Sequence, residues 1–100
     1  MIISDLVIPD TPVRELCRRY QVSELSLFGS TVTGSARQDS DVDILVAFRP
    51  EARIGFIEFS KLRQELSELL GRDVDLAPKD GLKDVIRDEV LSSAQVIYAE

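Results

Sequence analysis

The sequence predicts an α/β (α+β) fold in which one small mixed β-sheet of about four strands packs with four helices. Two observations support this prediction. Short apolar runs alternate along the chain with longer segments whose apolar residues recur every three or four positions. In addition, 100 residues with 44% hydrophobic and 30% charged side chains are typical of one globular unit, so we expect a single domain over residues 1–100.

The first predicted helix covers residues 12–20. Asp10 precedes it as a residue that can cap a helix, and Pro12 suits the first helical turn. Four side chains then recur at helical spacing and are expected to face the core: Val13, Leu16, Cys17 and Tyr20.

The longest predicted helix covers residues 55–70 and ends at Gly71. Its inward face is expected to consist of Phe56, Phe59, Leu62, Leu66, Leu69 and Leu70. Two shorter segments complete the four helices. One is a helical turn that Ser30 can cap and Gly34 ends, and the other covers about 82–92.

Four short runs are expected to be strands, at 25–28, 42–48, 73–77 and 94–99. The run 42–48 reads VDILVAF and suits a strand that is buried on both faces over most of its length. Residues 1–10 have a mixed pattern, which predicts a flexible lead or a short edge strand.

The composition excludes several classes of site. A net charge of −6 disfavours direct binding of nucleic acid, and the absence of histidine excludes imidazole metal sites and Ser-His-Asp triads. The one cysteine, Cys17, cannot form an internal disulfide, and we expect it to be a buried small side chain. Neither a signal peptide nor an apolar run of about 20 residues is present, so we expect a cytoplasmic protein without membrane contact.

Two acidic residues, Asp41 and Asp43, open the predicted strand 42–48. Residues two apart on a strand point to the same side, so their carboxylates repel each other unless a cation lies between them. Carboxylate oxygens suit Mg²⁺ or Mn²⁺. The alternative is that both acids lie on the solvated face of an edge strand, but the apolar run that follows argues for an interior strand.

Gly29 and Ser30 follow the predicted strand 25–28, and ten residues separate them from Asp41. A glycine lets a phosphate approach the backbone, and a serine hydroxyl can donate a hydrogen bond to it. The alternative is a plain turn in which Ser30 caps the helix. Together with two metal-binding acids, this arrangement suits a nucleoside triphosphate.

Asp75 is the third acid of interest, because it lies inside the predicted strand 73–77 between two apolar residues. If this strand lies beside 42–48, Asp75 joins the other two acids. It could then be a metal ligand or a general base toward an attacking hydroxyl. Asp73 shares its face but is nearer the turn, where we expect it to be solvated.

The pattern of Gly29-Ser30, ten residues and Asp41-x-Asp43 resembles the signature of the DNA polymerase β-type nucleotidyltransferase superfamily. The short chain resembles its minimal nucleotidyltransferases, the MNT-domain antitoxins, over nearly its whole length. The resemblance implies the nucleotidyltransferase fold. It also implies that Gly29 and Ser30 bind the triphosphate, that Asp41 and Asp43 hold Mg²⁺, and that Asp75 is the third catalytic acid and metal ligand.

The same resemblance implies a Mg²⁺-dependent adenylyltransferase that moves AMP from ATP to a hydroxyl and releases pyrophosphate. The implied acceptor is a tyrosine of a helical, dimeric HEPN-type toxin, which makes this chain the antitoxin of a type VII-like pair. Thr31 and Thr33 stand where many members carry arginine, and Arg37 is either a substitute or a solvated side chain. Two alternatives stay open: a degenerate antitoxin that acts by binding alone, and a nucleotidyltransferase with a small-molecule acceptor.

Overall fold

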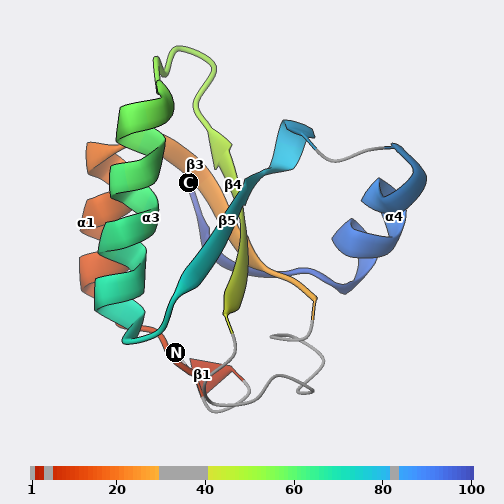
Figure 1. Cartoon of the computed structure of the whole chain (residues 1–100), viewed down its shortest axis with the longest axis horizontal. Coiled ribbons are helices and arrows are strands. Elements are labelled where there is room, and N and C mark those ends of the chain that lie inside the picture. The colour runs from red at the N-terminus through yellow and green to blue at the C-terminus, as the bar shows by residue number, and fades with distance from the viewer. Residues whose placement is uncertain (1, 4–5, 30–40, 82–83) are drawn as a thin grey trace.

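Four strands form the main sheet in the order β5-β4-β3-β6 (Figure 1). The computed structural model describes residues 2–3, 6–29, 41–81 and 84–100, with 84–87 and 89 as backbone alone. The central strand β3 (Val22–Leu27) is antiparallel to both β4 (Val42–Phe48) and β6 (Gln95–Ala99). The edge strand β5 (Val74–Pro78) is parallel to β4. The predicted mixed sheet of four strands is therefore confirmed.

The helices lie on the two sides of this sheet. α1 (Asp10–Arg19) and α3 (Phe56–Leu70) pack side by side against one face, and α4 (Asp84–Ser93) lies on the other side (Figure 1). The described residues hold three α-helices rather than the predicted four, and the helical turn expected at Ser30 falls outside them. None of the described helices combines the length and the apolar character that a membrane span needs.

The core lies between the sheet and helices α1 and α3. Val42, Ile44 and Val46 alternate along β4 and belong to the same buried cluster as Leu62 and Leu66 of α3. We call this side of the sheet the helix face. Since successive side chains of a strand point to opposite sides, the residues between them project from the other side, which we call the carboxylate face.

Helix α1 buries three of its four predicted core residues, Val13, Leu16 and Cys17. Cys17 is fully buried, and burial raises the pKa of its thiol to about 12. The fourth, Tyr20, is half-buried, and its hydroxyl donates to Glu65 of α3 at 2.5 Å. This contact joins the two helices at the end of α1.

The start of α1 differs from the prediction. Asp10 is the first helical residue rather than the cap, and Pro9 takes the capping position without a side-chain hydrogen bond. The fixed φ of proline suits the residue that leads into a helix, so the helix begins two residues earlier than predicted.

Helix α3 buries Leu62, Leu66 and Leu70, and Gly71 ends it in the left-handed conformation, as predicted. The prediction was wrong for Phe56, whose side chain is 85% exposed. Phe59, one turn later, is the first residue of the helix to pack against the core, where its ring centroid lies 6.4 Å from that of Phe48. The first turn of α3 therefore extends past the core.

The described part of the first ten residues, 2–3 and 6–10, differs from the predicted flexible lead or short edge strand. β1 (Ile2–Ile3) and β2 (Leu6–Val7) form a separate antiparallel pair. Ile3, Leu6 and Ile8 are buried in the core cluster. Burial of these three apolar side chains holds the two short strands against the core.

Candidate active site

Asp43 and Asp75 lie opposite each other on neighbouring strands. β4 and β5 run parallel, and their register pairs Asp43 with Asp75. The residues on either side of both acids belong to the core, so both carboxylates lie on the carboxylate face. Adjacent strands are about 4.8 Å apart, which keeps the two acids close. The condition under which Asp75 was expected to join the other acids, that its strand lies beside 42–48, is therefore met.

Asp41 lies one residue before β4 and is exposed, whereas Asp43 is half-buried. Burial raises the pKa of Asp43, and the negative charges of Asp75 and then Asp41 raise it further. Asp75 and Asp41 thus both act on Asp43, although they come from two separate segments. A cation beside them would reverse this effect, because it would favour the ionised carboxylates.

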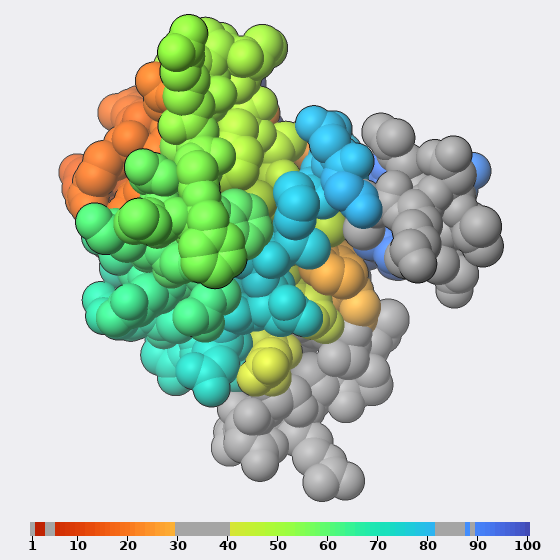
Figure 2. All heavy atoms as spheres, turned by 45° about the horizontal axis from the view of Figure 1, so that its top comes forward, coloured from red at the N-terminus to blue at the C-terminus, as the bar shows by residue number. Residues whose placement is uncertain are grey.

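Gly29 follows β3 and presses against Asp43. The Phe28 N–H donates to the backbone oxygen of Asp43 at 3.1 Å, which holds the end of β3 beside the start of β4. Gly29 has φ +63°, and a Cβ atom placed on it would lie 2.8 Å from Oδ2 of Asp43. The position thus favours glycine both for its left-handed backbone and for lack of space. On the molecular surface, the end of β3, the start of β4 and β5 lie next to one another (Figure 2).

The acids present fit a hard divalent cation. Among the described residues, no three acidic or cysteine side chains are placed close enough together to hold a metal ion. Asp41 and Asp75 are exposed, however, and exposed side chains change rotamer within nanoseconds. Their oxygens and those of Asp43 are the donors that Mg²⁺ and Mn²⁺ prefer. Ser30 lies outside the described residues, so its role stays a prediction.

The carboxylate face also carries an ion pair that the sequence analysis did not identify. Lys79, in the short 3-10 helix η1 (Lys79–Gly81), lies 2.8 Å from Glu24 of β3, and both side chains are half-buried. The pair spans β4 and joins its two neighbouring strands. Lys79 lies one residue beyond β5 in a helical turn, so alternation along the strand does not place its side chain, and no local signal identifies the pair.

A sequence profile of the nucleotidyltransferase domain matches residues 12–97, which include all of the residues described above as the site. This chain belongs to the nucleotidyltransferase domain family. One relative is the protein adenylyltransferase MntA of Thermococcus cleftensis, which is 45% identical to this chain over 85 residues. The alignment covers 85% of this chain and 82% of MntA.

Two solved structures show the same fold. One is a toxin–antitoxin with AMP-PNP, with a TM-score of 0.72 and 24% identity over 93% of this chain and 75% of the other. The second is a tri-AMPylated HEPN toxin of Shewanella oneidensis in complex with its MNT antitoxin. It gives a TM-score of 0.62 and 22% identity, and the match covers 91% of this chain and 70% of the other. The predicted nucleotidyltransferase fold is therefore confirmed.

Proposed function

We propose that this protein is a protein adenylyltransferase that moves AMP from ATP to a tyrosine of a dimeric HEPN toxin and so acts as its antitoxin. Family membership and the 45% identity to MntA support the reaction class. The solved toxin–antitoxin structures with AMP-PNP and with AMPylated HEPN toxin support the nucleotide and the acceptor. The observation that carries the proposal is the pairing of Asp43 with Asp75 beside the Gly29 turn.

The residues of the site divide between binding the triphosphate and binding a cation. Gly29 lets a phosphate reach the backbone, and the Ser30 hydroxyl donates to it. Asp41 and Asp43, with Asp75, would hold Mg²⁺ or Mn²⁺, and the bound ion would offset the negative charge of the triphosphate. The protein itself contributes the positions of the reacting groups.

We assign the role of general base to Asp75. It is exposed and comes from a different strand than Asp43, so it can face a hydroxyl that enters from solvent. The hydroxyl proton passes to the Asp75 carboxylate, and the oxygen forms a bond to the α-phosphorus of ATP. The bond from that phosphorus to the bridging oxygen breaks, and pyrophosphate leaves with the electron pair. A general base contributes about 10²–10⁴-fold to such a rate.

The test is co-expression of the toxin with the Asp75→Ala variant, followed by intact-mass analysis of the toxin. We expect the wild-type protein to add one or more adenylyl groups. Asp75→Ala should still bind ATP and toxin but add none. Asp73→Ala is the matched control, because Asp73 is an exposed acid immediately before β5 and should not be needed for transfer.

The rival is an antitoxin that neutralises its toxin by binding alone, and Thr31 and Thr33 favour it, since the resemblance to minimal nucleotidyltransferases implies arginine at these positions. That reading predicts equal protection of cells by the wild-type protein and Asp75→Ala, with no gain of mass on the toxin. Transfer to a small molecule in the absence of toxin would instead indicate a different acceptor. Either result would contradict the proposal.

A further inference from the structure

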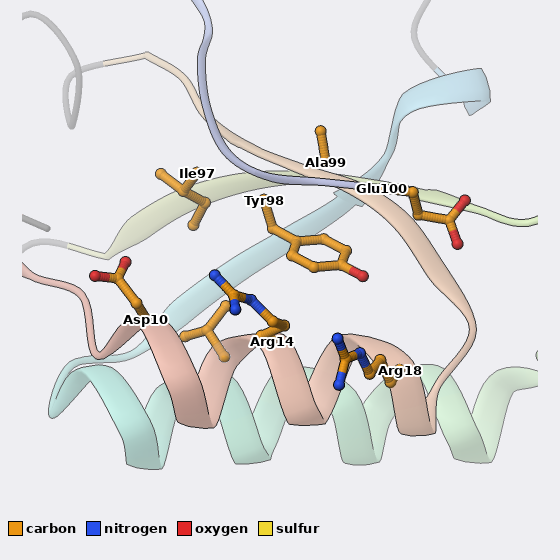
Figure 3. Close-up of a pocket in the computed structure, with 8 residues that line it drawn as sticks. Asp10, Arg14, Arg18, Ile97, Tyr98, Ala99 and Glu100 are labelled. Carbon is orange, nitrogen blue, oxygen red and sulfur yellow. The ribbon is translucent and has the colours of Figure 1, made fainter.

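A pocket of about 450 Å³ lies between α1 and β6 (Figure 3). Its volume is in the range of about 300–1,000 Å³ that is usual for sites of small ligands. Arg14 and Arg18 extend into it from α1, and Tyr98 reaches it from β6. Asp10 and Glu100 lie at its two ends. The pocket thus presents two cations and a phenol between two carboxylates.

The pocket is separate from the carboxylates of the candidate active site. Tyr98 is paired with Leu25 of β3, and paired residues of neighbouring strands project from the same face. Leu25 belongs to the core under α1 and α3, so Tyr98 is on the helix face. Asp43 projects from the opposite face. A ligand of the pocket therefore cannot be held by the acids proposed for catalysis.

An irregularity in β6 directs the side chains of Ile97 and Tyr98 toward the pocket. The pairing of β3 with β6 passes from Leu25–Tyr98 to Ser26–Val96, which leaves Ile97 as an extra residue in β6. A bulge of this kind changes the direction in which neighbouring side chains project. As a result, Ile97 and Tyr98 are consecutive residues, yet both pack against the core and both line the pocket.

The two arginines are available to a ligand. Arg14 and Arg18 are one helical turn apart, and neither forms an ion pair with another residue in the described part of the chain. The neighbouring Arg19, in contrast, pairs with Glu65 at 2.9 Å. Two adjacent guanidinium groups suit a phosphate, because their N–H groups can donate to different oxygens of the same group.

The acids at the ends of the pocket restrict what the rest of the ligand can be. Glu100 is bound by Arg49, and each carboxylate can accept several hydrogen bonds. A second negative group would be repelled by Asp10 and Glu100, whereas hydroxyl or amino groups could donate to them. The Tyr98 ring adds an aromatic surface between the two ends.

We propose that the pocket between α1 and β6 binds a small molecule that carries one phosphate together with hydroxyl or amino groups. Arg14 and Arg18 bind the phosphate. The side chains of Asp10 and Glu100 accept hydrogen bonds from the rest of the molecule, and Tyr98 packs against it. This inference does not rest on the proposed transfer reaction, and either can fail without the other.

The test is a titration of the isotope-labelled protein with AMP and with inorganic phosphate, followed by amide NMR without divalent cations. We expect AMP to shift residues 13–18 and 97–100 and to bind more tightly than inorganic phosphate. Arg14→Gln and Arg18→Gln should each weaken AMP binding about tenfold, the effect of losing a hydrogen bond to a charged group. Arg63→Gln, on the exposed side of α3, is the matched control and should leave the affinity unchanged.

Any of four results would overturn the inference. Shifts confined to Gly29, Asp41–Asp43 and Asp75 would assign the only site to the carboxylate face. Wild-type affinity in both pocket variants would remove the arginines from binding. Equal affinity for AMP and inorganic phosphate, or binding of an acidic peptide but not of AMP, would contradict the ligand class. Both arginines are exposed, so the variants should fold, and thermal unfolding of each variant verifies this.

Discussion

The side chains that β4 presents on the two faces of the sheet have opposite effects on stability. On β4, Ile44 is fully buried against the helices, whereas Asp43, one residue earlier, projects from the carboxylate face. Burying a side chain such as Ile44 stabilises the fold by about 1.5–3 kcal/mol. Asp43 has the opposite effect, because burial and the nearby charges of Asp75 and Asp41 disfavour its ionised form. Substitutions on the two faces should therefore separate transfer activity from stability.

The largest effect should follow from Gly29→Ala. The added Cβ would lie 2.8 Å from Oδ2 of Asp43, so either the turn or the carboxylate must move. A displacement of about 1 Å in a site can lower a rate by about 100-fold. The left-handed backbone should cost about 1–2 kcal/mol of stability in addition. The measurements are the rate of AMP transfer to the toxin and the free energy of unfolding in urea.

Gly71→Ala is the matched control for this prediction. Gly71 has φ +69°, and no atom lies within 4 Å of the position that its Cβ would take. We expect a similar loss of stability with a wild-type rate of transfer. If both variants lose activity to the same degree, the backbone conformation rather than contact with Asp43 explains the loss.

On the helix face, Ile44→Ala should lower the free energy of unfolding by about 2–5 kcal/mol, because it leaves a cavity between β4 and the helices. The transfer rate per folded molecule should stay that of the wild type. Ile44→Val should cost about 0.5–1.5 kcal/mol, and it provides a variant that remains folded. A transfer rate that falls in Ile44→Val would show that the two faces are not independent.

The smallest effect concerns pH. Because burial and the neighbouring acids raise the pKa of Asp43 above 3.8, its ordinary value, the folded protein keeps this proton to higher pH than the unfolded chain does. Stability of the wild type therefore falls as pH rises from the ordinary pKa through the raised one, and this loss persists at neutral pH. Asn carries no charge, so Asp43→Asn avoids the loss.

We therefore expect Asp43→Asn to be more stable than the wild type at pH 7, and the difference should vanish near about pH 3. The measurement is urea unfolding at both pH values with a chelator present, since a bound cation would stabilise the wild type alone. A wild type that is the more stable protein at pH 7 under these conditions would contradict the assignment of Asp43 to a repulsive cluster.

Much of the fold could be predicted where a single segment contains its own signal. The strand 42–48 was predicted at both ends, because VDILVAF is one nearly continuous apolar run. The strand before it begins at Val22 rather than at the predicted Leu25. The prediction missed this start because Ser23 and Glu24 are polar and have their partners in other segments of the chain. The Ser23 hydroxyl donates to the Ala47 oxygen at 3.1 Å, and Glu24 pairs with Lys79. Contacts between distant segments of this kind are not visible in local periodicity.

The candidate site shows the same division. Alternation along each strand indicated an acidic side for each, and Asp75 was expected to join Asp43 only if the two strands were neighbours, which the register shows. The contact of Gly29 with Asp43 could not be predicted, because it depends on how β3 and β4 meet in space. The helical spacing of Arg14 and Arg18 likewise does not reveal that a bulge in β6 directs Tyr98 toward them.

The thiol of Cys17 can be used to measure how often α1 separates from the sheet. It is the one cysteine of the sequence, it is fully buried, and its raised pKa keeps the thiol protonated at neutral pH. A thiol reagent can reach it only when α1 separates from the sheet, so the labelling rate measures how often the native protein opens there. Helix α1 also carries Arg14 and Arg18, so a molecule that bridges α1 and β6 would slow this opening. The labelling rate of Cys17 would then report the occupancy of the pocket, although Cys17 does not touch the ligand.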